Sequence, residues 1–543
     1  MALHAHWLEP AFDGGATLLN AWAQWLALPE SGGQRLLYST LLEQPLPDLA
    51  SPGDLPGGLA QALWKELQAR WTGMVPGLQR LSLQGGRLEL GVWVLGGRLT
   101  REEALRQASN APVHRVLQGT SAAEPGLART RAPSGRSFVT NPTTARRAVV
   151  VGGGLSGAAV AYSLATRGWQ VEVLDAAHAP ASGASGLPLG LVAPHVSPDD
   201  ALLSRLTRAG VRATLQRAEA LLVADETWGL SGSLERRLEH RRALPPAPDD
   251  ATLACQRQWS RDATAAELTA AHLPPDSDAL WHQHAGWVQP AALVQAQLNH
   301  PGILWRGGQT VARLVRSNPC SHGGSEGPLW ALLDAQGHTL AEAPVVVLAT
   351  AYGTRALLEE LQRDKPTVPV PPYNPLRGQV SWGLLPQPAE GAPPMPALLP
   401  PWPVHGHGSF LQGPGGNWIV GSTFERGATH SRTTTEDHAL NQARLKVLLP
   451  ELAQSPAGAA LFEQPRGWAG VRCTLPDRLP TLGEPDPANA PGLLLCAGMG
   501  ARGLTLSVLC GEVLAAALHQ EPWPLEEKLV RALLAQRFAP VRT

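Results

Sequence analysis

The chain has 543 residues, which is enough for two or three domains with a large buried core. Its formal net charge is -1 at pH 7, so no overall basic field points to a nucleic-acid partner, and any such partner has to be contacted locally. The five cysteines are odd in number and lack C-x-x-C spacing, which argues against a zinc site or a disulfide framework.

The first ten residues lack the basic start and the apolar core of a signal peptide. No run of about 18 apolar residues is evident further along the chain. We therefore expect a cytoplasmic protein with no membrane partner.

Residues 1–105 have the pattern of a small folded region. Leu18, Trp22 and Trp25 recur at i, i+4 and i+7, which predicts an amphipathic helix. Residues 78–95 alternate between apolar and polar side chains around two glycines, which predicts a β-hairpin.

A linker is predicted at residues 106–146, where the apolar period fades and Pro, Ser, Gly and Thr become frequent. Between Gln107 and Arg147 the chain carries six arginines against a single acid, Glu124. The segment is either a solvated tether or an arm that contacts phosphate groups, and the sequence leaves both interpretations open.

The most informative stretch is a glycine turn that follows the apolar run 148–151. Gly152 can take the sharp turn, Gly154 lets a pyrophosphate approach the backbone, and Gly157 lets the following helix pack close to its strand. A second apolar run ends in Asp175, at the distance where a carboxylate meets the adenosine ribose. This combination predicts a dinucleotide site, with an ordinary glycine-rich turn as the alternative.

A second cluster of small residues, 181–186, follows the turn. Its backbone amides and the hydroxyl of Ser185 are predicted to close over a cofactor phosphate. Residues 201–222 then predict a helix that carries four arginines. Such a helix usually shows a solvated face, and contact with nucleic acid is the alternative.

Three later runs, 310–315, 329–333 and 345–349, have the composition of strands. The last run is continuous and apolar, as for a strand that is buried on both faces of a sheet. Towards the C-terminus, Gly500-Ala-Arg502-Gly503 opens an apolar helix predicted to run through Ala516. The N-terminus of that helix would point at the cofactor.

Five motifs in this order resemble the FAD-dependent amino-acid and amine oxidases of the D-amino-acid oxidase type. They are the glycine turn, the Gly-Ala-Ser-Gly loop at 183–186, Arg377-Gly378-Gln379, the run from Arg472, and the loop Gly500 to Gly503. More closely, the segments 421–427, 470–480 and 500–504 resemble the MnmC family, the bifunctional enzymes of tRNA wobble-uridine modification.

This resemblance implies two activities on tRNA. A C-terminal flavin region would oxidatively remove the carboxymethyl group from 5-carboxymethylaminomethyl-(2-thio)uridine and leave the aminomethyl form, with oxygen as the expected oxidant. An N-terminal region would then methylate that amine with S-adenosylmethionine. The residues implied in FAD binding are Gly152, Gly154, Gly157, Asp175, Ser185, Gly500, Arg502 and Gly503.

The resemblance also implies a role for one arginine. Arg472 takes the position where related amine oxidases hold the substrate carboxylate, and the planar guanidinium suits that task because it binds a carboxylate with two hydrogen bonds. The alternative is a structural ion pair with Asp477. Cys473 beside it is interpreted as a small apolar filler.

We predict an α/β protein with an FAD-binding Rossmann-like domain, an inserted α+β substrate domain of the D-amino-acid oxidase type, and a truncated α/β methyltransferase-like N-terminal region. The expected regions are 1–105, the linker 106–146 and the flavin region 147–543. Within the last, FAD-binding segments are expected at about 147–200, 285–355 and 468–520, and the substrate domain at about 201–284 and 356–467.

The sequence departs from the family pattern mainly at its N-terminus. Residues 11–22 stand where the family has a glycine-rich cofactor turn, and Leu42 stands where an acidic residue would hold the cofactor ribose. An apolar side chain cannot replace the acceptors of a carboxylate, so we expect the methyltransferase region to be inactive and S-adenosylmethionine not to serve as a cofactor. In the flavin region, Leu187 replaces an asparagine-like residue and Ala351 replaces a glycine.

Other interpretations stay open on the sequence. The chain is alternatively a fully bifunctional enzyme, a free glycine or D-amino-acid oxidase, or an oxidase whose N-terminal region only docks tRNA. His405 and His407 have no third ligand nearby in the sequence, so we interpret them as loop histidines and predict no metal site.

Overall fold

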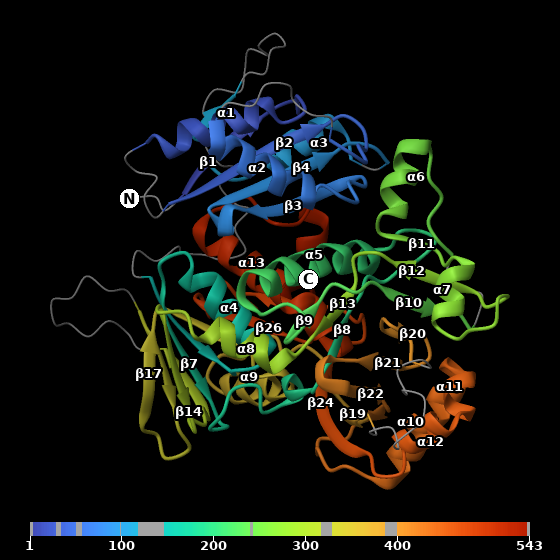
Figure 1. Ribbon diagram of the computed structural model, residues 1–543. Helices are drawn as coiled ribbons and strands as arrows, with labels where there is room; N and C mark the ends of the chain where they lie inside the picture. Colours follow the sequence, from blue (N-terminus) through green and yellow to red (C-terminus); the bar gives the residue numbers. More distant parts are fainter. Residues whose placement is uncertain are drawn as a thin grey trace. The chain divides into compact units, whose positions relative to one another are not determined.

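The computed structural model describes residues 4–28, 34–49, 57–97, 99–117, 146–238, 243–316, 328–385 and 399–539. The chain divides into two compact units (Figure 1). Unit 1 comprises Met1–Phe138, Pro245–Trp259 and Ala515–Arg531. Unit 2 comprises Val139–Leu244, Ser260–Leu514 and Ala532–Thr543.

Unit 1 is built on a five-stranded sheet with the order β3-β4-β2-β1-β5. Its strands are β1 (His4–Glu9), β2 (Arg35–Leu42), β3 (Gly77–Leu83), β4 (Leu88–Val94) and β5 (Arg115–Val116). All neighbours pair in parallel except β3 and β4, which form the predicted hairpin. The predicted first helix is α1 (Ala16–Leu26), and its Leu18, Trp22 and Trp25 are buried. The other helices of the N-terminal stretch are α2 (Gly57–Arg70) and α3 (Arg101–Ala108).

Residues 106–117, which we expected to begin the linker, belong to the fold of unit 1. They include the end of α3 and the strand β5, which pairs with Trp7 and Leu8 of β1. Arg115 donates a hydrogen bond to Gln24 at 3.0 Å and lies over the ring of Trp7, so it is part of this unit and not of a tether. The arginines at 129–136 lie outside the described residues.

Two distant segments complete unit 1, and one of them corrects an expected boundary. Residues 245–259, with α6 (Asp250–Arg257), were expected in the substrate domain. The indole of Trp259 instead donates to the carbonyl of Gly73 at 2.9 Å. In the C-terminal segment, the backbone of Glu527 donates to the side chain of Gln107 at 2.7 Å.

The first sheet of unit 2 has the order β14-β7-β6-β18-β26-β25. The parallel strands are β6 (Arg147–Val151), β7 (Gln170–Asp175), β14 (Ile303–Gly307), β18 (Val345–Leu348) and β26 (Leu493–Ala497), and β25 (Thr481–Gly483) is antiparallel. As predicted, every residue of β18 is buried. The strand order reverses beside β6, and open sheets of this kind bind ligands beyond the carboxyl ends of the strands at such a point.

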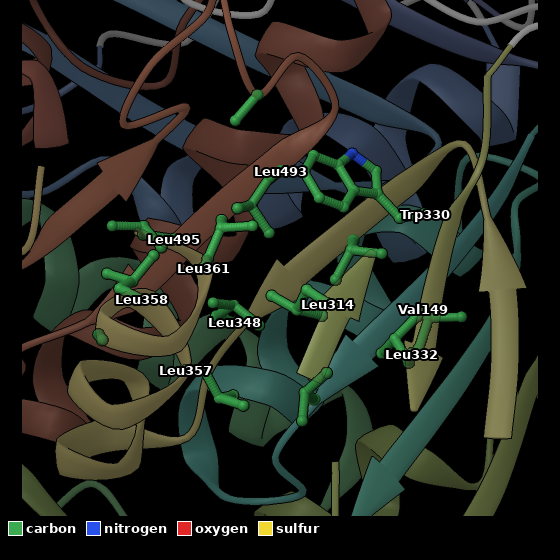
Figure 2. Packing of buried hydrophobic residues seen from close by; sticks show 14 of the residues in the cluster. Val149, Leu314, Trp330, Leu332, Leu348, Leu357, Leu358, Leu361, Leu493 and Leu495 are labelled. Atoms are coloured by element: carbon green, nitrogen blue, oxygen red, sulfur yellow. The ribbon is translucent and has the colours of Figure 1, made fainter. Parts of the chain in front are cut away.

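One face of this sheet is covered by a second, antiparallel sheet. It consists of β15 (Arg313–Arg316), β16 (Trp330–Leu333) and β17 (Thr339–Ala343). Together with α9 (Thr354–Leu361), these strands supply the apolar cluster of Figure 2, in which Leu314, Trp330 and Leu358 gather with Leu348 and Leu493 of the parallel sheet. Full burial of each such side chain stabilises the fold by about 1.5–3 kcal/mol.

The largest sheet of unit 2 has the order β11-β12-β10-β20-β21-β22-β19-β23, and β24 also pairs with β19. Its strands are β10 (Ser233–Arg236), β11 (Ser260–Asp262), β12 (Ala279–His282), β19 (Asn374–Leu384), β20 (Val404–His405), β21 (Ser409–Gln412), β22 (Asn417–Gly421), β23 (Glu425–Arg426) and β24 (Arg466–Thr474). The helices near it are α7 (Ala265–Ala270), α10 (Thr435–Leu448), α11 (Pro450–Gln454) and α12 (Pro456–Leu461). A small sheet joins β8 (Gly190–Val192), β13 (Gly286–Val288) and β9 (Trp228–Gly229). The predicted α/β class with an inserted substrate sheet is confirmed.

The remaining helices are α4 (Leu155–Ala165), α5 (Leu202–Leu221), α8 (Pro290–Leu298), α13 (Gly503–His519) and α14 (Glu527–Leu533). Gly500–His519 is long and apolar enough to cross a membrane by length and composition alone, although Arg502 and Glu512 interrupt it and it is therefore not a continuous apolar run. However, 78% of its apolar window is buried inside the structure, as is typical of a core helix.

The arginines of α5 bond largely within the protein. Arg208 forms an ion pair with Asp200, and Arg217 forms one with Glu512 at 2.8 Å. Burial lowers the pKa of Arg212 to about 10. The structure therefore supports neither a solvated face nor a nucleic-acid contact for these three arginines.

Candidate functional site

Unit 2 contains a cavity of about 560 Å³. Its walls come from the segments that follow three parallel strands, with Leu155 after β6, Ala351 after β18, and Gly498 after β26. The opposite wall is formed by the large sheet and includes Val380 and Arg472. The volume lies in the usual range of small-molecule sites, at the position where an open α/β sheet binds its ligand.

The glycine turn has the close approaches that its sequence predicts. Gly152 has φ +108°, and its amide donates to the carbonyl of Leu174 at 2.7 Å. A Cβ atom at Gly152 would lie 2.6 Å from the carbonyl oxygen of Ala349, and one at Gly157 would lie 1.8 Å from the carbonyl oxygen of Gly152. Larger residues at these two positions would push β6, β18 and α4 apart.

Ser185 lies at the N-terminus of α4 and lines the cavity. Its Oγ accepts the amide hydrogen of Leu155 at 2.9 Å, and a Cβ atom at Gly154 would lie 2.9 Å from this oxygen. The first amides of a helix have no partner within the helix, so Ser185 satisfies one of them while its hydroxyl hydrogen stays available.

Asp175 ends β7 and bonds to the backbone of the glycine turn. Its Oδ2 accepts from the amide of Gly153 at 2.6 Å, and its Oδ1 accepts from the amide of Ala177 at 2.8 Å. A carboxylate has about four acceptor positions, so it retains capacity for the hydroxyls of a ribose.

The predicted cofactor residues fall into two groups. Ser185, Gly500, Arg502 and Gly503 line the cavity. Gly152, Gly154, Gly157 and Asp175 build the turn behind it and do not appear in its wall. Gly500 has φ +58°, the left-handed region that favours glycine, in the turn that opens α13.

Arg472 projects from β24 into the cavity. Its Nη2 donates to Oγ of Ser422 at 2.5 Å, and its guanidinium carbon lies 5.0 Å from the ring centre of Phe424. Its Nη1 is buried and has no hydrogen-bond partner among the described residues. A buried donor of this kind requires a partner, which the structure leaves for a ligand.

The electrostatic surroundings of Arg472 are those of an anion site. Burial lowers the pKa of its guanidinium to about 10, with no opposing contribution from a carboxylate. Asp477, the alternative ion-pair partner, instead accepts from Nε of Arg537 at 2.8 Å. The structural ion pair with Asp477 is therefore wrong, and the cation is available for an anionic ligand in the cavity.

The Arg377-Gly378-Gln379 motif lies on β19, the strand that pairs with β24, and packs against Arg472. A Cβ atom at Gly378 would lie 2.6 Å from Nη2 of Arg472, so only glycine leaves space for the guanidinium. Arg377 is 1% exposed and binds Asp437 at 2.8 Å. The motif thus fixes the wall of the cavity and does not itself line it.

Sequence reasoning missed several residues of the wall. Ser422, Phe424 and Arg444 line the cavity, as do Glu235 and His195. Ser422 and Phe424 stand in the segment 421–427 that carries the family resemblance, which was the available signal. Nothing in the local sequence of the helix α10 marks Arg444.

His405 and His407 both line the cavity. The ring of His405 stacks on that of His282 at 5.6 Å, and its Nε2 lies 3.3 Å from Oγ of Ser233. Within the described ranges, the one group of three potential metal ligands is elsewhere, in unit 1, where His4, His519 and Glu521 place ligand atoms within 4.8 Å of one another.

The departures at Leu187 and Ala351 both lie in the cavity wall. Ala351 has φ +51°, a left-handed conformation in which glycine is favoured, so the position still has the backbone of a glycine. Cys473 is buried in the apolar cluster of the parallel sheet, and burial raises its pKa to about 12. These values agree with its interpretation as an apolar filler.

Comparisons with known proteins agree with this architecture. Residues 147–517 match the family described as FAD dependent oxidoreductase. Among solved structures, glycine oxidase from Geobacillus kaustophilus superimposes with a TM-score of 0.51 at 20% identity, covering 69% of this chain and 95% of that one. L-proline dehydrogenase from P. horikoshii gives a TM-score of 0.52 at 18% identity, covering 72% and 98%. These likenesses show the fold and confirm the predicted architecture of the flavin region.

Curated relatives are more similar in sequence. The chain is 40% identical over 609 residues to the tRNA 5-methylaminomethyl-2-thiouridine biosynthesis bifunctional protein MnmC of Paracidovorax citrulli, over 98% of this chain and 91% of that protein. The protein of the same name from Verminephrobacter eiseniae is 39% identical, over 98% and 96%. With this coverage, the chain belongs to the MnmC family of bifunctional tRNA-modification proteins and contains its FAD-dependent oxidoreductase domain.

Proposed function

We propose that the chain oxidatively removes the carboxymethyl group from 5-carboxymethylaminomethyl-(2-thio)uridine at the wobble position of tRNA, leaving the 5-aminomethyl form. The observation that carries the proposal is the buried Nη1 of Arg472, which has no hydrogen-bond partner among the described residues and lies on a guanidinium in the cavity wall. An anion is the partner that such a group requires. The side chain of this modified uridine ends in a carboxylate.

The residues in and behind the cavity wall also suit FAD. The close packing at Gly152 and Gly157 brings the N-terminus of α4 to the turn, and Ser185 stands beside it. Gly500, Arg502 and Gly503 form the second part of the proposed cofactor site. When bound, FAD would accept a hydride from the carbon between the amine and the carboxylate of the substrate. Water would then hydrolyse the resulting substrate imine, which breaks the C–N bond and releases glyoxylate and the 5-aminomethyl nucleoside.

Arg472 positions the substrate. Ser422 fixes its Nη2, which orients Nη1 towards the carboxylate and holds the reacting carbon in place. We assign no general base, because the neutral amine of the substrate supports the departure of the hydride. Oxygen is the proposed final oxidant, and the reaction is placed in the bacterial cytoplasm, where tRNA is modified.

We further propose that the N-terminal region is a truncated methyltransferase half without activity. Both carboxylate oxygens of Asp13 accept from the amide of Thr17 in the first turn of α1, where the family places its cofactor turn. Phe12 stacks on Trp71 at 5.0 Å, and Leu42 is buried. The alignment with the first relative spans 609 residues, more than this whole chain, so the relative contains segments that this chain lacks.

The direct test uses bulk tRNA from a strain that lacks this activity. The purified protein is incubated with the tRNA, with and without S-adenosylmethionine, and the nucleosides are analysed by mass spectrometry. We expect loss of the carboxymethylaminomethyl nucleoside and gain of the aminomethyl form, with no methylation when the methyl donor is present. An unchanged profile from flavin-loaded protein would contradict the oxidase proposal, and a methylated product would contradict the inactive N-terminal region.

A variant pair tests the assigned arginine. Arg472→Met should lower kcat/KM for tRNA by about 100-fold or more, because the carboxylate loses its charged partner. Arg466→Met is the matched control, since Arg466 is an exposed arginine of the same strand that lies over Trp382 and not in the cavity wall. Equal activity of the two variants would exclude Arg472 as the carboxylate site.

A further inference from the structure

Two arginines lie over one aromatic ring at the cavity. The guanidinium carbon of Arg472 is 5.0 Å from the ring centre of Phe424, and that of Arg444 is 5.6 Å from it. All three side chains line the cavity. Phe424 is 53% exposed, so much of its apolar surface is open to a ligand. The cavity therefore holds a second cation, Arg444, which shares the ring of Phe424 with the proposed carboxylate-binding Arg472.

Arg444 differs in its contacts from Arg472 of the cavity wall and from Arg377, which is buried behind that wall. Arg472 bonds to Ser422, and Arg377 bonds to Asp437. In the part of the chain that the structure describes, the guanidinium of Arg444 forms neither an ion pair nor a hydrogen bond. Its cation–π contact there is with the ring of Phe424. Its five donors are available to a ligand.

The helix that carries Arg444 is fixed to the cavity wall. Ser381 of β19 lies 2.7 Å from Nδ1 of His438, and Nη1 of Arg377 binds Asp437 at 2.8 Å. The side-chain amide of Asn441 donates to the carbonyl of Gln379 at 3.1 Å. The first two turns of α10 are thus tied to β19, the strand that also pairs with β24. The two arginines are held on one rigid frame.

Resting on the proposed function, we propose that Arg444 and Phe424 form a nucleotide-recognition subsite. Arg444 binds the 5′-phosphate of the modified uridine, and Phe424 packs against its uracil ring. In an anti pyrimidine nucleotide, the substituent at C5 lies on the same side as the 5′-phosphate. A nucleotide with a carboxylate on C5 therefore presents two anions on one side with an apolar ring between them.

The residues match that pattern in order and in chemistry. Arginine binds phosphate with two parallel hydrogen bonds, and an aromatic side chain is the usual partner of an unstacked base. A free amino acid such as glycine reaches Arg472 but has no group for Arg444 or Phe424. The subsite would therefore select a nucleotide over free amino acids in the same cavity.

The experiment measures anaerobic bleaching of the protein-bound flavin by four defined probes. They are N-methylglycine, 5-carboxymethylaminomethyluridine, and the 5′- and 3′-monophosphates of that nucleoside. The full chain is used as wild type and as Arg444→Ala, Arg444→Lys, Phe424→Ala and Phe424→Tyr. Lys446→Ala and Leu440→Ala are the controls, because Lys446 is an exposed cation of the same helix and Leu440 is also 53% exposed, and neither lines the cavity.

For the wild type we expect the 5′-monophosphate to react with a kcat/KM about 10–100-fold above that of the nucleoside, from KM more than from kcat. Arg444→Ala should remove this gain, so that the 5′-monophosphate and the nucleoside react with similar kcat/KM, and Arg444→Lys should retain part of the gain. Phe424→Ala should lower kcat/KM for the nucleoside and its monophosphates by about 5–100-fold more than for N-methylglycine, which has no base and is affected only through the contact of Phe424 with Arg472. Phe424→Tyr should keep kcat/KM for all four probes near the wild-type values. The control variants Lys446→Ala and Leu440→Ala should have kcat/KM values within about twofold of wild type for every probe.

Three results would overturn the inference while leaving the proposed function intact. They are equal reactivity of nucleoside and 5′-monophosphate, a gain with the 3′-monophosphate alone, and a 5′-phosphate gain that survives Arg444→Ala. If N-methylglycine or glycine bleaches the flavin and no modified uridine or tRNA does, the proposed function itself fails, and the inference fails with it.

Discussion

Gly378 leaves the space that the guanidinium of Arg472 occupies. A Cβ atom at Gly378 would lie 2.6 and 2.7 Å from the two terminal nitrogens of that arginine and 2.6 Å from the carbonyl oxygen of Thr423. The carboxylate site therefore depends on a missing side chain on the neighbouring strand. Gly378 and Arg472 are 94 positions apart in the sequence, and the antiparallel pairing of β19 with β24 brings them together.

Gly378→Ala should displace the guanidinium and lower kcat/KM by about 10- to 100-fold, because a shift of about 1 Å in a positioning group has an effect of that order. Steady-state kinetics with tRNA or N-methylglycine measure it. Gly353→Ala is the control, since its added Cβ would make an ordinary contact of 3.5 Å with Thr350. Unchanged kinetics in Gly378→Ala would mean that the guanidinium position is not critical.

Arg472→Met should make the protein more stable while it removes activity. Nη1 of Arg472 is a buried donor without a hydrogen-bond partner among the described residues, and methionine, a shorter unbranched apolar side chain, removes the cost of burying it. We expect the free energy of unfolding to rise by about 1–3 kcal/mol, measured by denaturant titration with flavin fluorescence as the signal. The exposed Arg466→Met should change it by no more than about 0.5 kcal/mol.

Binding of a carboxylate without an amino group should weaken at high pH. The folded-state pKa of Arg472 is about 10, below its ordinary value of 12.5, because burial disfavours the cation. As pH rises through about 10 the site loses its charge, and the Kd of acetate should rise about fourfold between pH 8 and pH 10.5. Titration of the flavin absorbance with acetate measures this, and a Kd that stays constant would contradict a charged-arginine site. The pH dependence of folding without a ligand has the opposite sign. The unfolded chain binds the arginine proton more tightly than the folded chain, so the free energy of unfolding rises from pH 10 towards 12.5.

Glu9 should destabilise unit 1 at neutral and higher pH. Its Oε2 accepts from the hydroxyl of Tyr38 at 2.8 Å, and burial raises its pKa from 4.5 to about 7. The folded state holds this proton more tightly, so stability is greatest below pH 4.5 and falls as pH rises towards 7 and stays low above it. Glu9→Gln should recover about 3 kcal/mol at pH 8 and little at pH 4.

Hydrogen exchange measured by mass spectrometry on peptides of β1 and β2 reports this local stability. Each variant is compared with the wild type at the same pH. Glu102→Gln, at an exposed carboxylate of α3, is the control and should leave the exchange of these peptides unchanged. Faster exchange of Glu9→Gln at pH 8 would contradict the prediction.

Ala351→Gly should stabilise unit 2. Ala351 has φ +51°, and a side chain in this conformation costs about 1 kcal/mol relative to glycine. We expect a gain of about 0.5–1 kcal/mol in denaturant unfolding. The control is Ala349→Gly, two residues earlier, where φ is ordinary and the free energy of unfolding should fall by a similar amount. If both substitutions changed the free energy of unfolding in the same direction, strain at Ala351 would not be the cause.

The sequence alone determined the nucleotide-binding half of the flavin region. Strand, glycine turn and helix are adjacent in the chain, so the spacing of Gly152, Gly154 and Gly157 already predicts the turn and the contact of Gly157 with Gly152. The strand at 345–349 was recognisable because a strand buried on both faces is apolar at every position. The helix around Trp22 was recognisable from its period for the same local reason.

The substrate half was decided by the tertiary structure. Sequence resemblance pointed to Arg472, but only the pairing of β24 with β19 placed Gly378 beneath it and left Nη1 without a partner among the described residues. Arg444 lies in the same cavity wall because α10 packs on β19. The local sequence of α10 contains no pattern that predicts this position. The end of unit 1 was likewise misplaced, because Arg115 and Trp259 join it through contacts with residues more than 90 positions away. Contacts between neighbours in the chain follow from spacing, whereas contacts between distant strands depend on which strands pair, and that is a property of the whole fold.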